Sequence, residues 1–268
     1  MPEGHTIHRM AKDHSKWFQG RVVSLRSPQG RFSAGAQQLD GAVFRGAYAH
    51  GKHLFYRLDP HDQASLNIHI HLGLFGKFRK RASEEVEPSP NCRLRMCSDT
   101  HVLDLSGPTC CEVLTPEEAA AKCGTLGPDP LRSDGSASQF AARLKRRRIP
   151  IAAALLDQKV IAGLGNIYRA ELLFHHRINP MTPAADLTEN TARELWDTAA
   201  WWLDLGVRAN RIITVLDASP KRVPRLPRRE AVFIYGKQNC PVCGDGIVRR
   251  EVGNRTLFVC DTCQTRKS

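Results

Sequence analysis

A chain of 268 residues is long enough for two domains with separate hydrophobic cores. Its hydrophobic content of 41% and charged content of 25% are ordinary for a globular protein, and no apolar run reaches membrane-spanning length. The formal net charge is +12, and most of this excess falls after residue 138. The asymmetry favours a polyanion partner such as nucleic acid, with a basic surface that binds nothing as the alternative.

The chain begins with Met1-Pro2-Glu3, and the residues that follow are too polar and charged for a signal peptide. We therefore expect a cytoplasmic protein. If Met1 is removed, Pro2 becomes a secondary amine one residue from a carboxylate. Two interpretations are open: a proline tolerated at a chain start, or a nucleophile with Glu3 as its proton-transfer partner. Apolar spacing predicts a helix over residues 6–18, which puts both residues near the positive end of its dipole.

Short apolar or alternating segments recur between residues 21 and 105, separated by clusters of Gly, Pro, Asn and Asp. Because no long helix lies between them, we expect an antiparallel sandwich or a flattened barrel. Lys52 follows Gly51 at the entry to one of these strands. It projects either from a functional loop or simply into solvent.

A strictly alternating strand then places His69 and His71 on one face. A metal pair is one interpretation, but no third ligand is evident from the sequence. After this strand, Leu74 and Phe75 lie between two glycines. They are either core residues or a wedge that enters a base stack.

Residues 124–138 are rich in Gly, Pro, Ser and Asp, which marks a domain boundary, and the pattern after them is helical. A glycine-punctuated turn that contains Lys159 and Asn166 separates two of the predicted helices. Its exposed backbone N–H groups can bind phosphate. The basic, proline-rich segment 216–230 is either a solvated linker or a DNA-facing loop. The predicted helices cover 139–145 with Ser138 as the cap, 151–157, 167–176 and 188–205.

Four cysteines close the chain in two Cys-x2-Cys pairs, which is the spacing of a structural zinc site with one ion per chain. Between the pairs, the sequence predicts a β-hairpin with Gly253-Asn254 at its turn. Arg255 would lie at the tip, as a phosphate ligand or as a solvated side chain. The other five cysteines lack metal spacing, and we expect reduced thiols. The zinc ligands are Cys240, Cys243, Cys260 and Cys263.

These segments, in this order, resemble the formamidopyrimidine-DNA glycosylase/endonuclease VIII family over essentially the whole chain. The matching motifs are Pro2-Glu3-Gly4, Gly51-Lys52, GLGNIY at 163–168, and the finger segments IYGKQNCPVCG and GNRTLFVCDTCQ. The resemblance implies an α+β fold with an N-terminal helix. Its parts would be an N-terminal catalytic β-sandwich domain (1–123), a linker (124–138), a helix–two-turn–helix DNA-binding domain (139–235) and a four-cysteine zinc finger (236–268).

The resemblance also implies a monomeric, bifunctional DNA glycosylase/AP lyase of base excision repair. Its partner would be double-stranded DNA that contains damaged bases or abasic sites. Pro2 would attack the sugar C1′ and form a Schiff base, Glu3 would act as general acid/base, and Lys52 would contact DNA and the reacting centre. β,δ-Elimination would then cut the strand. The remaining DNA-binding residues would be Leu74 and Phe75, which fill the gap left by a flipped base, and Lys159, Asn166 and Arg255.

Residues 106–111 lack the Arg-Arg-Phe-Gly pattern with which one branch of the family helps to fill that gap. This favours the endonuclease VIII branch, which prefers oxidised pyrimidines. Thr6 replaces a glutamate common in the family, and Gly73 replaces the glutamine of the endonuclease VIII wedge, which affects damage preference more than reaction class. The alternatives are an oxidised-purine glycosylase within the family, and a non-enzymatic zinc-finger protein that binds damaged or bent DNA.

Overall fold

The computed structural model describes residues 2–61, 64–216, 223–224 and 226–265. The chain divides into two compact units. One contains Pro2 and Ile7–Thr125, and the other contains Glu3–Thr6 and Leu126–Ser268. The predicted domain limits at 123, 138 and 235 stay predictions. Among the helices in the described part of the chain, none is long and apolar enough to cross a membrane.

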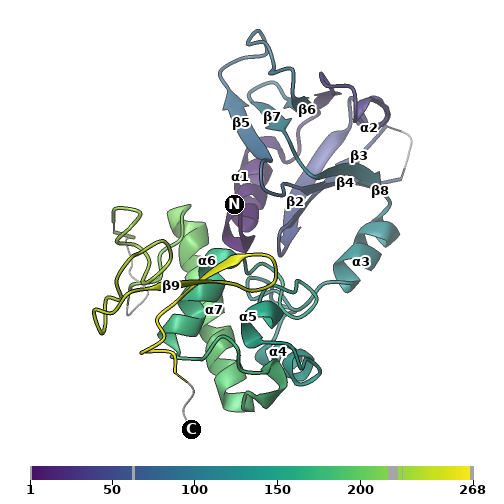
Figure 1. The fold of residues 1–268 in the computed structure, drawn as a ribbon. Helices are drawn as coiled ribbons and strands as arrows, with labels where there is room; N and C mark the ends of the chain where they lie inside the picture. The colour runs from purple at the N-terminus through teal and green to yellow at the C-terminus, as the bar shows by residue number, and fades with distance from the viewer. Residues whose placement is uncertain (1, 62–63, 217–222, 225, 266–268) are drawn as a thin grey trace. The chain divides into compact units, whose positions relative to one another are not determined.

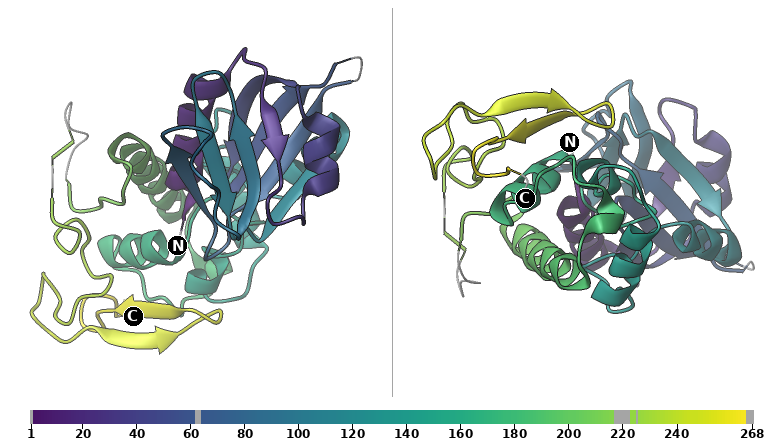
Figure 2. Two further views of the ribbon diagram at one scale, coloured as in Figure 1. Left: turned by 90° about the horizontal axis from the view of Figure 1, so that it is seen from above. Right: turned by 60° about the horizontal axis from the view of Figure 1, so that its bottom comes forward.

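The first unit is a β-sandwich of two four-stranded antiparallel sheets, which excludes the barrel alternative (Figures 1 and 2). One sheet has the order β1 (Ser24–Arg26), β6 (Cys92–Cys97), β7 (Val102–Ser106), β5 (Lys77–Arg81). The other has the order β2 (Val43–His50), β3 (His53–Asp59), β4 (Leu66–His71), β8 (Cys110–Leu114). The helices are α1 (Gly4–Phe18), α2 (Ser33–Leu39) and α3 (Pro116–Gly124).

The core of the first unit follows the alternation of its strands. In β4, Ile68 and Ile70 are fully buried, as the sequence predicts for the face opposite the histidines. The predicted apolar stripe of α1 is confirmed, because Ile7, Ala11 and Phe18 pack into the same core.

A buried ion network connects three strands, β5, β6 and β7, of the first sheet. The Asp104 carboxylate, 1% exposed, accepts hydrogen bonds from Nε of Arg95 at 2.8 Å and Nε of Arg81 at 2.6 Å. Arg95 also donates to the carbonyls of Glu84 and Val86, which holds the polar loop before β6. Burial alone would raise the pKa of Asp104, but the hydrogen bonds and charges of the two arginines lower it below its ordinary value.

The second unit contains helices around a tryptophan-rich core, followed by a two-stranded hairpin (Figure 1). Trp202 and Tyr168 are fully buried in this core. Trp202 belongs to the helix predicted over 188–205, and Leu195, Ala199 and Leu203 of that helix are buried in the same core. The elements are α4 (Ala137–Lys145), α5 (Ile151–Ala154), α6 (Asn166–His175), η1 (Ala184–Asp186), α7 (Glu189–Ala209), β9 (Val248–Glu251) and β10 (Thr256–Val259).

The structure corrects the predicted elements in several places. The helix α4 is capped by Ser136, whose hydroxyl accepts from the Gln139 N–H in a capping box, and the prediction of Ser138 was wrong. The elements α2, α3 and the edge strand β8 were not predicted. Of these, α3 has an N-terminal capping signal in the sequence: the Thr115 hydroxyl accepts from the Glu118 N–H, and Pro116 occupies the first turn.

We predict that Asp104→Asn destabilises the protein by about 3–5 kcal/mol, because it leaves the buried guanidinium of Arg95 without its counter-ion. Urea unfolding of the full chain measures this. The matched control is Asp99→Asn, which removes a carboxylate 67% exposed in its ion pair with Arg21 and should cost no more than about 1 kcal/mol. Equal losses in the two variants would contradict the prediction.

Candidate functional site

The side chain of Glu3 binds the N-terminus of α6 within the second unit. It is fully buried, and its carboxylate accepts from the backbone N–H of Gly165 at 2.7 Å and of Ile167 at 2.9 Å. A helix N-terminus favours negative charge because its first N–H groups have no partner inside the helix. Glu3 directly precedes α1, as the sequence predicts, and its carboxylate also caps α6, which the sequence did not predict.

This arrangement requires glycine at two positions, because another group lies too close to the backbone there for a side chain to fit. A Cβ atom at Gly165 would lie 2.4 Å from Cδ of Glu3, and one at Gly4 would lie 2.8 Å from Cα of Gly163. The N–H of Gly4 also donates to the carbonyl of Gly163 at 2.8 Å. The glycine-rich turn therefore brings its backbone against the segment that carries Glu3.

The first unit holds Pro2 and Lys52, both half-buried. Lys52 lies in the two-residue turn between β2 and β3, where Gly51 has a φ of +57°. This is a tight hairpin and not a long loop, so its tip follows the sheet register closely. The charge of Lys52 contributes, after burial, to lowering the pKa of His71.

Leu74 and Phe75 are exposed at the turn between β4 and β5. Their exposed fractions are 49% and 82%, which excludes the interpretation of this pair as core residues. Two glycines shape the turn: Gly73 has a φ of +63°, and a Cβ at Gly76 would lie 2.3 Å from the carbonyl oxygen of Leu72. An exposed apolar pair at the tip of a tight turn is available for contact with a partner.

Asn166 and the buried Arg169 connect α6 to the C-terminal hairpin. The Asn166 amide donates to the carbonyl of Thr256 at 2.7 Å and accepts from Nη2 of Arg169 at 2.5 Å. Arg169 also donates to the carbonyl of Val252 at 3.0 Å. Burial lowers the pKa of Arg169 to about 10, against the opposing effect of the Glu3 charge.

The hairpin forms the predicted turn, with Gly253 and Asn254 both at positive φ. Arg255 is exposed beside it, while its carbonyl accepts from Nη2 of Arg169 at 3.5 Å and from the Val252 N–H at 3.0 Å. Lys159 is exposed in the turn before α6. The structure thus brings Asn166 and the Arg255 turn together.

The four C-terminal cysteines form a group that can hold a metal ion, since all four Sγ atoms lie within 4.8 Å of one another. The Cys240–Cys263 and Cys243–Cys260 sulfurs are 3.7 and 3.4 Å apart. Tetrahedral zinc with four thiolates requires sulfur separations of about 3.8 Å. Backbone N–H groups of Val242 and Cys263 point at Sγ atoms of Cys240 and Cys260, at 3.4 and 3.5 Å, as expected for thiolate ligands.

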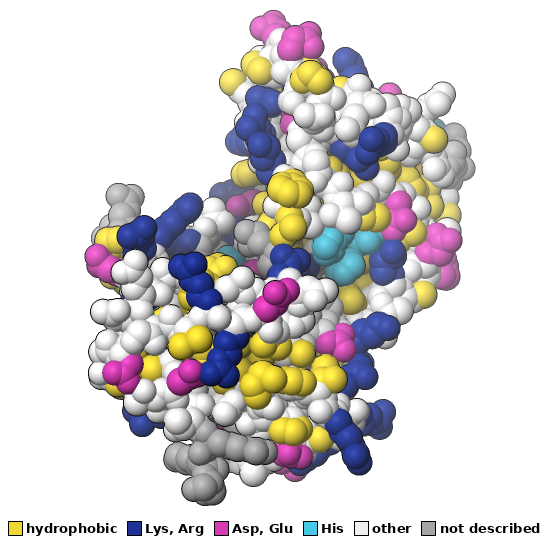
Figure 3. Space-filling view, in the orientation of Figure 1, with side chains coloured by type: hydrophobic (Ala, Val, Ile, Leu, Met, Phe, Trp, Pro, Cys, Tyr) yellow, Lys and Arg dark blue, Asp and Glu magenta, His cyan; other side chains and the backbone are white. Residues whose placement is uncertain are grey.

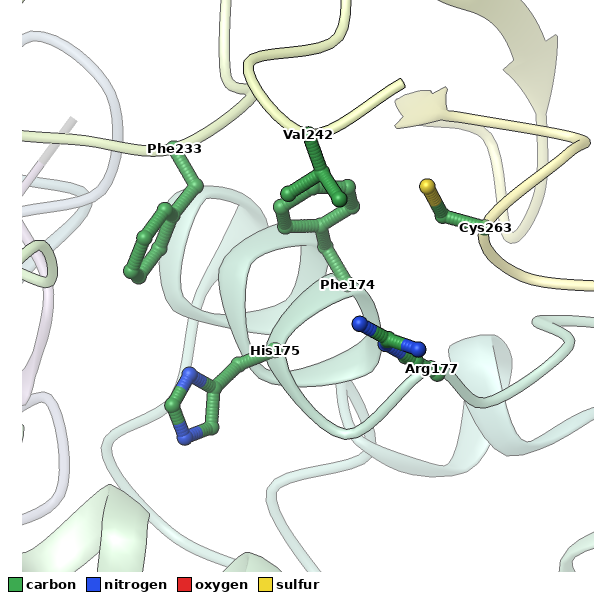
Figure 4. A pocket seen from close by; sticks show the side chains of 6 residues that line it. All are labelled: Phe174, His175, Arg177, Phe233, Val242 and Cys263. Atoms are coloured by element: carbon green, nitrogen blue, oxygen red, sulfur yellow. The ribbon is translucent and has the colours of Figure 1, made fainter.

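The cysteine cluster packs against the C-terminal end of α6 (Figure 4). Phe174, Phe233, Val242 and Cys263 are among the residues that line a pocket of about 110 Å³. Arg177 lines the same pocket, at the end of α6, with a left-handed φ of +53°. A cationic side chain beside a cluster of four thiolates offsets its negative charge.

Two buried charges in an otherwise apolar helix, Arg169 and Glu171, were not among the predicted site residues. The Glu171 carboxylate accepts from the backbone N–H groups of Phe233, Ile234 and Tyr235 and from the Thr214 hydroxyl. It therefore holds the segment that leads into the cysteine cluster. The readable signal was two charges, two residues apart, within the apolar stretch NIYRAELLFH.

Comparisons with known proteins identify relatives across the whole chain. Residues 1–108 match the formamidopyrimidine-DNA glycosylase N-terminal domain, and residues 126–217 match the formamidopyrimidine-DNA glycosylase H2TH domain. Endonuclease 8 1 of Mycobacterium tuberculosis is 42% identical over 99% of this chain and 100% of its own length. Formamidopyrimidine-DNA glycosylase of Thermus thermophilus is 33% identical over 80% of this chain and 79% of its own length.

Solved structures share the fold. Lactococcus lactis Fpg in complex with DNA that contains an abasic site has a TM-score of 0.82 at 22% identity, over 98% of this chain and 100% of that chain. MutM in complex with DNA that contains carbocyclic 8-oxo-G has a TM-score of 0.83 at 24% identity, over 99% and 100%.

We predict that Gly165→Ala destabilises the protein by about 1–3 kcal/mol or more, because the new methyl group forces the Glu3 carboxylate away from its two backbone donors. Chemical denaturation measures the change. Gly124→Ala is the control, since a Cβ at Gly124 has no atom within 4 Å. In a Glu3→Ala background the cost of Gly165→Ala should largely disappear. An unchanged cost there would contradict the proposed clash.

Proposed function

Because this chain belongs to the formamidopyrimidine-DNA glycosylase/endonuclease VIII family of DNA glycosylases, we propose that it removes oxidised pyrimidines from double-stranded DNA and cleaves the resulting abasic site. The observation that carries the proposal is the buried Glu3 carboxylate, fixed by two backbone N–H groups directly after Pro2. A fixed carboxylate next to a chain-terminal secondary amine is the pairing that Schiff-base chemistry on a sugar needs.

In a chain that has lost Met1, the nitrogen of Pro2 attacks C1′ of the damaged nucleotide, and the base leaves. An α-amino group has a pKa close enough to neutrality to supply some free amine. Opening of the sugar ring with proton transfer by Glu3 gives an iminium, which acidifies the C2′ hydrogen. Loss of that proton expels the 3′ phosphate, and a second elimination expels the 5′ phosphate.

The other candidate residues have chemistry suited to DNA. Lys52 supplies a cation at a tight hairpin turn, and Leu74 with Phe75 forms an exposed apolar tip that can fill the space of a flipped base. In the second unit, Lys159 and Arg255 are exposed cations for phosphates. Asn166 keeps one amide hydrogen available for a phosphate oxygen, because its other donates to Thr256.

We propose zinc as the ion of the four-cysteine group. Four thiolates close a tetrahedral shell and leave no open position, so the ion stabilises the finger and takes no part in the reaction. The hairpin between the cysteine pairs has two strands of four residues each, which is marginal alone. Zinc would therefore hold Arg255 in place.

The preference for oxidised pyrimidines rests on two observations. The 42% identity to endonuclease 8 1 exceeds the 33% and 28% identity to two proteins named formamidopyrimidine-DNA glycosylase. Residues 106–111 also lack the Arg-Arg-Phe-Gly pattern, and the connection from β7 to β8 within them is only residues 107–109, with Gly107 at a φ of +63°. The gap would then be filled by Leu74 and Phe75 alone.

We predict that borohydride reduction traps a covalent complex between the correctly processed protein and abasic-site DNA, because an iminium is reduced to a stable amine. Pro2→Gly should reduce the trapped fraction by about 100-fold if the nucleophile is misplaced by about 1 Å. The matched control is a form with an uncleaved N-terminal tag, which keeps every side chain but has an amide in place of the free amine of Pro2. Equal trapping by this form would refute Pro2 as nucleophile.

We predict that excision of thymine glycol exceeds excision of 8-oxoguanine under single-turnover conditions. The physical reason is that one short wedge must fill the gap left by the flipped base. Matched oligonucleotides that differ only in the lesion, each opposite its normal partner, measure the two rates. Faster excision of 8-oxoguanine would leave the glycosylase chemistry intact and replace the pyrimidine preference with the oxidised-purine alternative.

A further inference from the structure

A second group of metal-ligating side chains lies in the first unit, on the sheet formed by β3, β4 and β8. The strand register pairs His69 with Glu112 and His71 with Cys110. Because alternate residues of a strand face the same side, all four side chains project from one face of this sheet. The sequence alone offered His69 and His71 as a pair without a third ligand, and the pairing of β8 with β4 supplies it.

Three donor atoms of this group converge. Nδ1 of His69 is 2.9 Å from a carboxylate oxygen of Glu112 and 3.7 Å from Sγ of Cys110, and all three donor atoms lie within 4.8 Å of one another. Tetrahedral zinc with one nitrogen, one sulfur and one oxygen ligand requires separations of about 3.3–3.6 Å between them. The separation of His69 from Cys110 is already close to this range, and the Glu112 carboxylate oxygen must move slightly away from His69 to reach it.

The ring of His69 is held in the orientation that a ligand needs. It is 1% exposed, and its Nε2 is 2.8 Å from Nδ1 of His53. The ring also stacks on Phe55, with centroids 4.9 Å apart. A metal-binding histidine commonly donates its other ring N–H to a fixed partner, and His53 is that partner here.

Solvent reaches the group from the Glu112 side. The Glu112 side chain is 40% exposed, and that of Lys122, whose Nζ lies 2.8 Å from the same Glu112 oxygen, is 34% exposed. The ammonium competes with a cation for this oxygen, but its long side chain can withdraw into solvent. Histidine nitrogen, thiolate sulfur and carboxylate oxygen together favour zinc-class ions over magnesium or calcium.

We propose that His69, Cys110 and Glu112 form a second metal site, which binds a zinc-class divalent ion with water as the fourth ligand. The site shares no ligand with the four-cysteine finger, and its ion would take no part in the proposed glycosylase reaction. Figure 3 shows histidine side chains gathered on the molecular surface. The exposed Glu112 side chain gives an ion a path to the group without unfolding.

The test is a titration of the full-length, zinc-loaded protein with Co²⁺. Co²⁺ binds thiolates more weakly than zinc and leaves the filled finger occupied. The wild type should bind one further equivalent, with a sulfur-to-cobalt charge-transfer band and visible bands of tetrahedral cobalt. Cys110→Ser should lose the charge-transfer band and bind at least about 10-fold more weakly. Cys123→Ser, which changes another half-buried cysteine outside the group, should behave as the wild type.

The variant Lys122→Met should change the Co²⁺ affinity in the opposite direction. Removal of the competing ammonium beside a divalent ion should tighten Co²⁺ binding by about 10-fold. If Cys110→Ser fails to fold by circular dichroism, Glu112→Gln serves in its place. Binding of no further equivalent by the wild type would overturn the proposal, and so would unchanged binding in both ligand variants or weaker binding in Lys122→Met.

Discussion

The buried carboxylate of Glu3 is the interaction on which the candidate groups of the second unit depend. A buried charge must be satisfied, and here the donors are the backbone N–H groups of Gly165 and Ile167. These donors can reach it only because residue 165 has no side chain, since a Cβ would lie 2.4 Å from Cδ of Glu3. The same turn starts α6, whose first residue is Asn166. One glycine-rich segment therefore fixes both a carboxylate near the chain start and an amide 163 residues further on.

Buried polar side chains of α6 hold the C-terminal hairpin by hydrogen bonds. Arg169 donates to the carbonyl of Val252 on one side of the hairpin turn, and Asn166 donates to that of Thr256 on the other. A two-stranded hairpin of this length is not stable alone. It is held at its turn by α6 and at its base by the cysteines, and Arg255 lies in the turn, between the two residues whose carbonyls α6 contacts. The burial of Arg169 is tolerable because Nη1 and Nη2 both donate to carbonyl oxygens and the Glu3 charge favours the charged guanidinium.

What the sequence could predict was set by local patterns. The strands of the sandwich other than β8, the stripe of Ile7 and Phe18 in α1, the grouping of the four cysteines and the Gly253-Asn254 turn each have a short-range signal, and each is confirmed. The Glu3 cap was not predictable in this way, because its donors lie 162 and 164 residues away and no period links them. The edge strand β8 was missed because its residues are all half-buried, so it lacks the apolar alternation of its neighbours. The residues that join His69 in the proposed metal site, Cys110 and Glu112, were missed for the same reason, since both lie on β8.

The β2–β3 hairpin links the two candidate sites of the first unit. Lys52 lies in its turn, and His53, the next residue, is hydrogen-bonded through its ring to His69. A two-residue turn transmits the position of its flanking strands to its tip, so the placement of the Lys52 ammonium depends on what fixes His53. In the described structure this support runs from His53 through His69 to Glu112, in a row of hydrogen bonds across three neighbouring strands. The weakest hydrogen bond of that row is the one between His69 and Glu112, because the Glu112 carboxylate is exposed and shared with Lys122. A metal ion would replace it by two coordinate bonds, one to each residue. The ion would then stiffen the strand from which Lys52 projects while remaining outside the reaction itself.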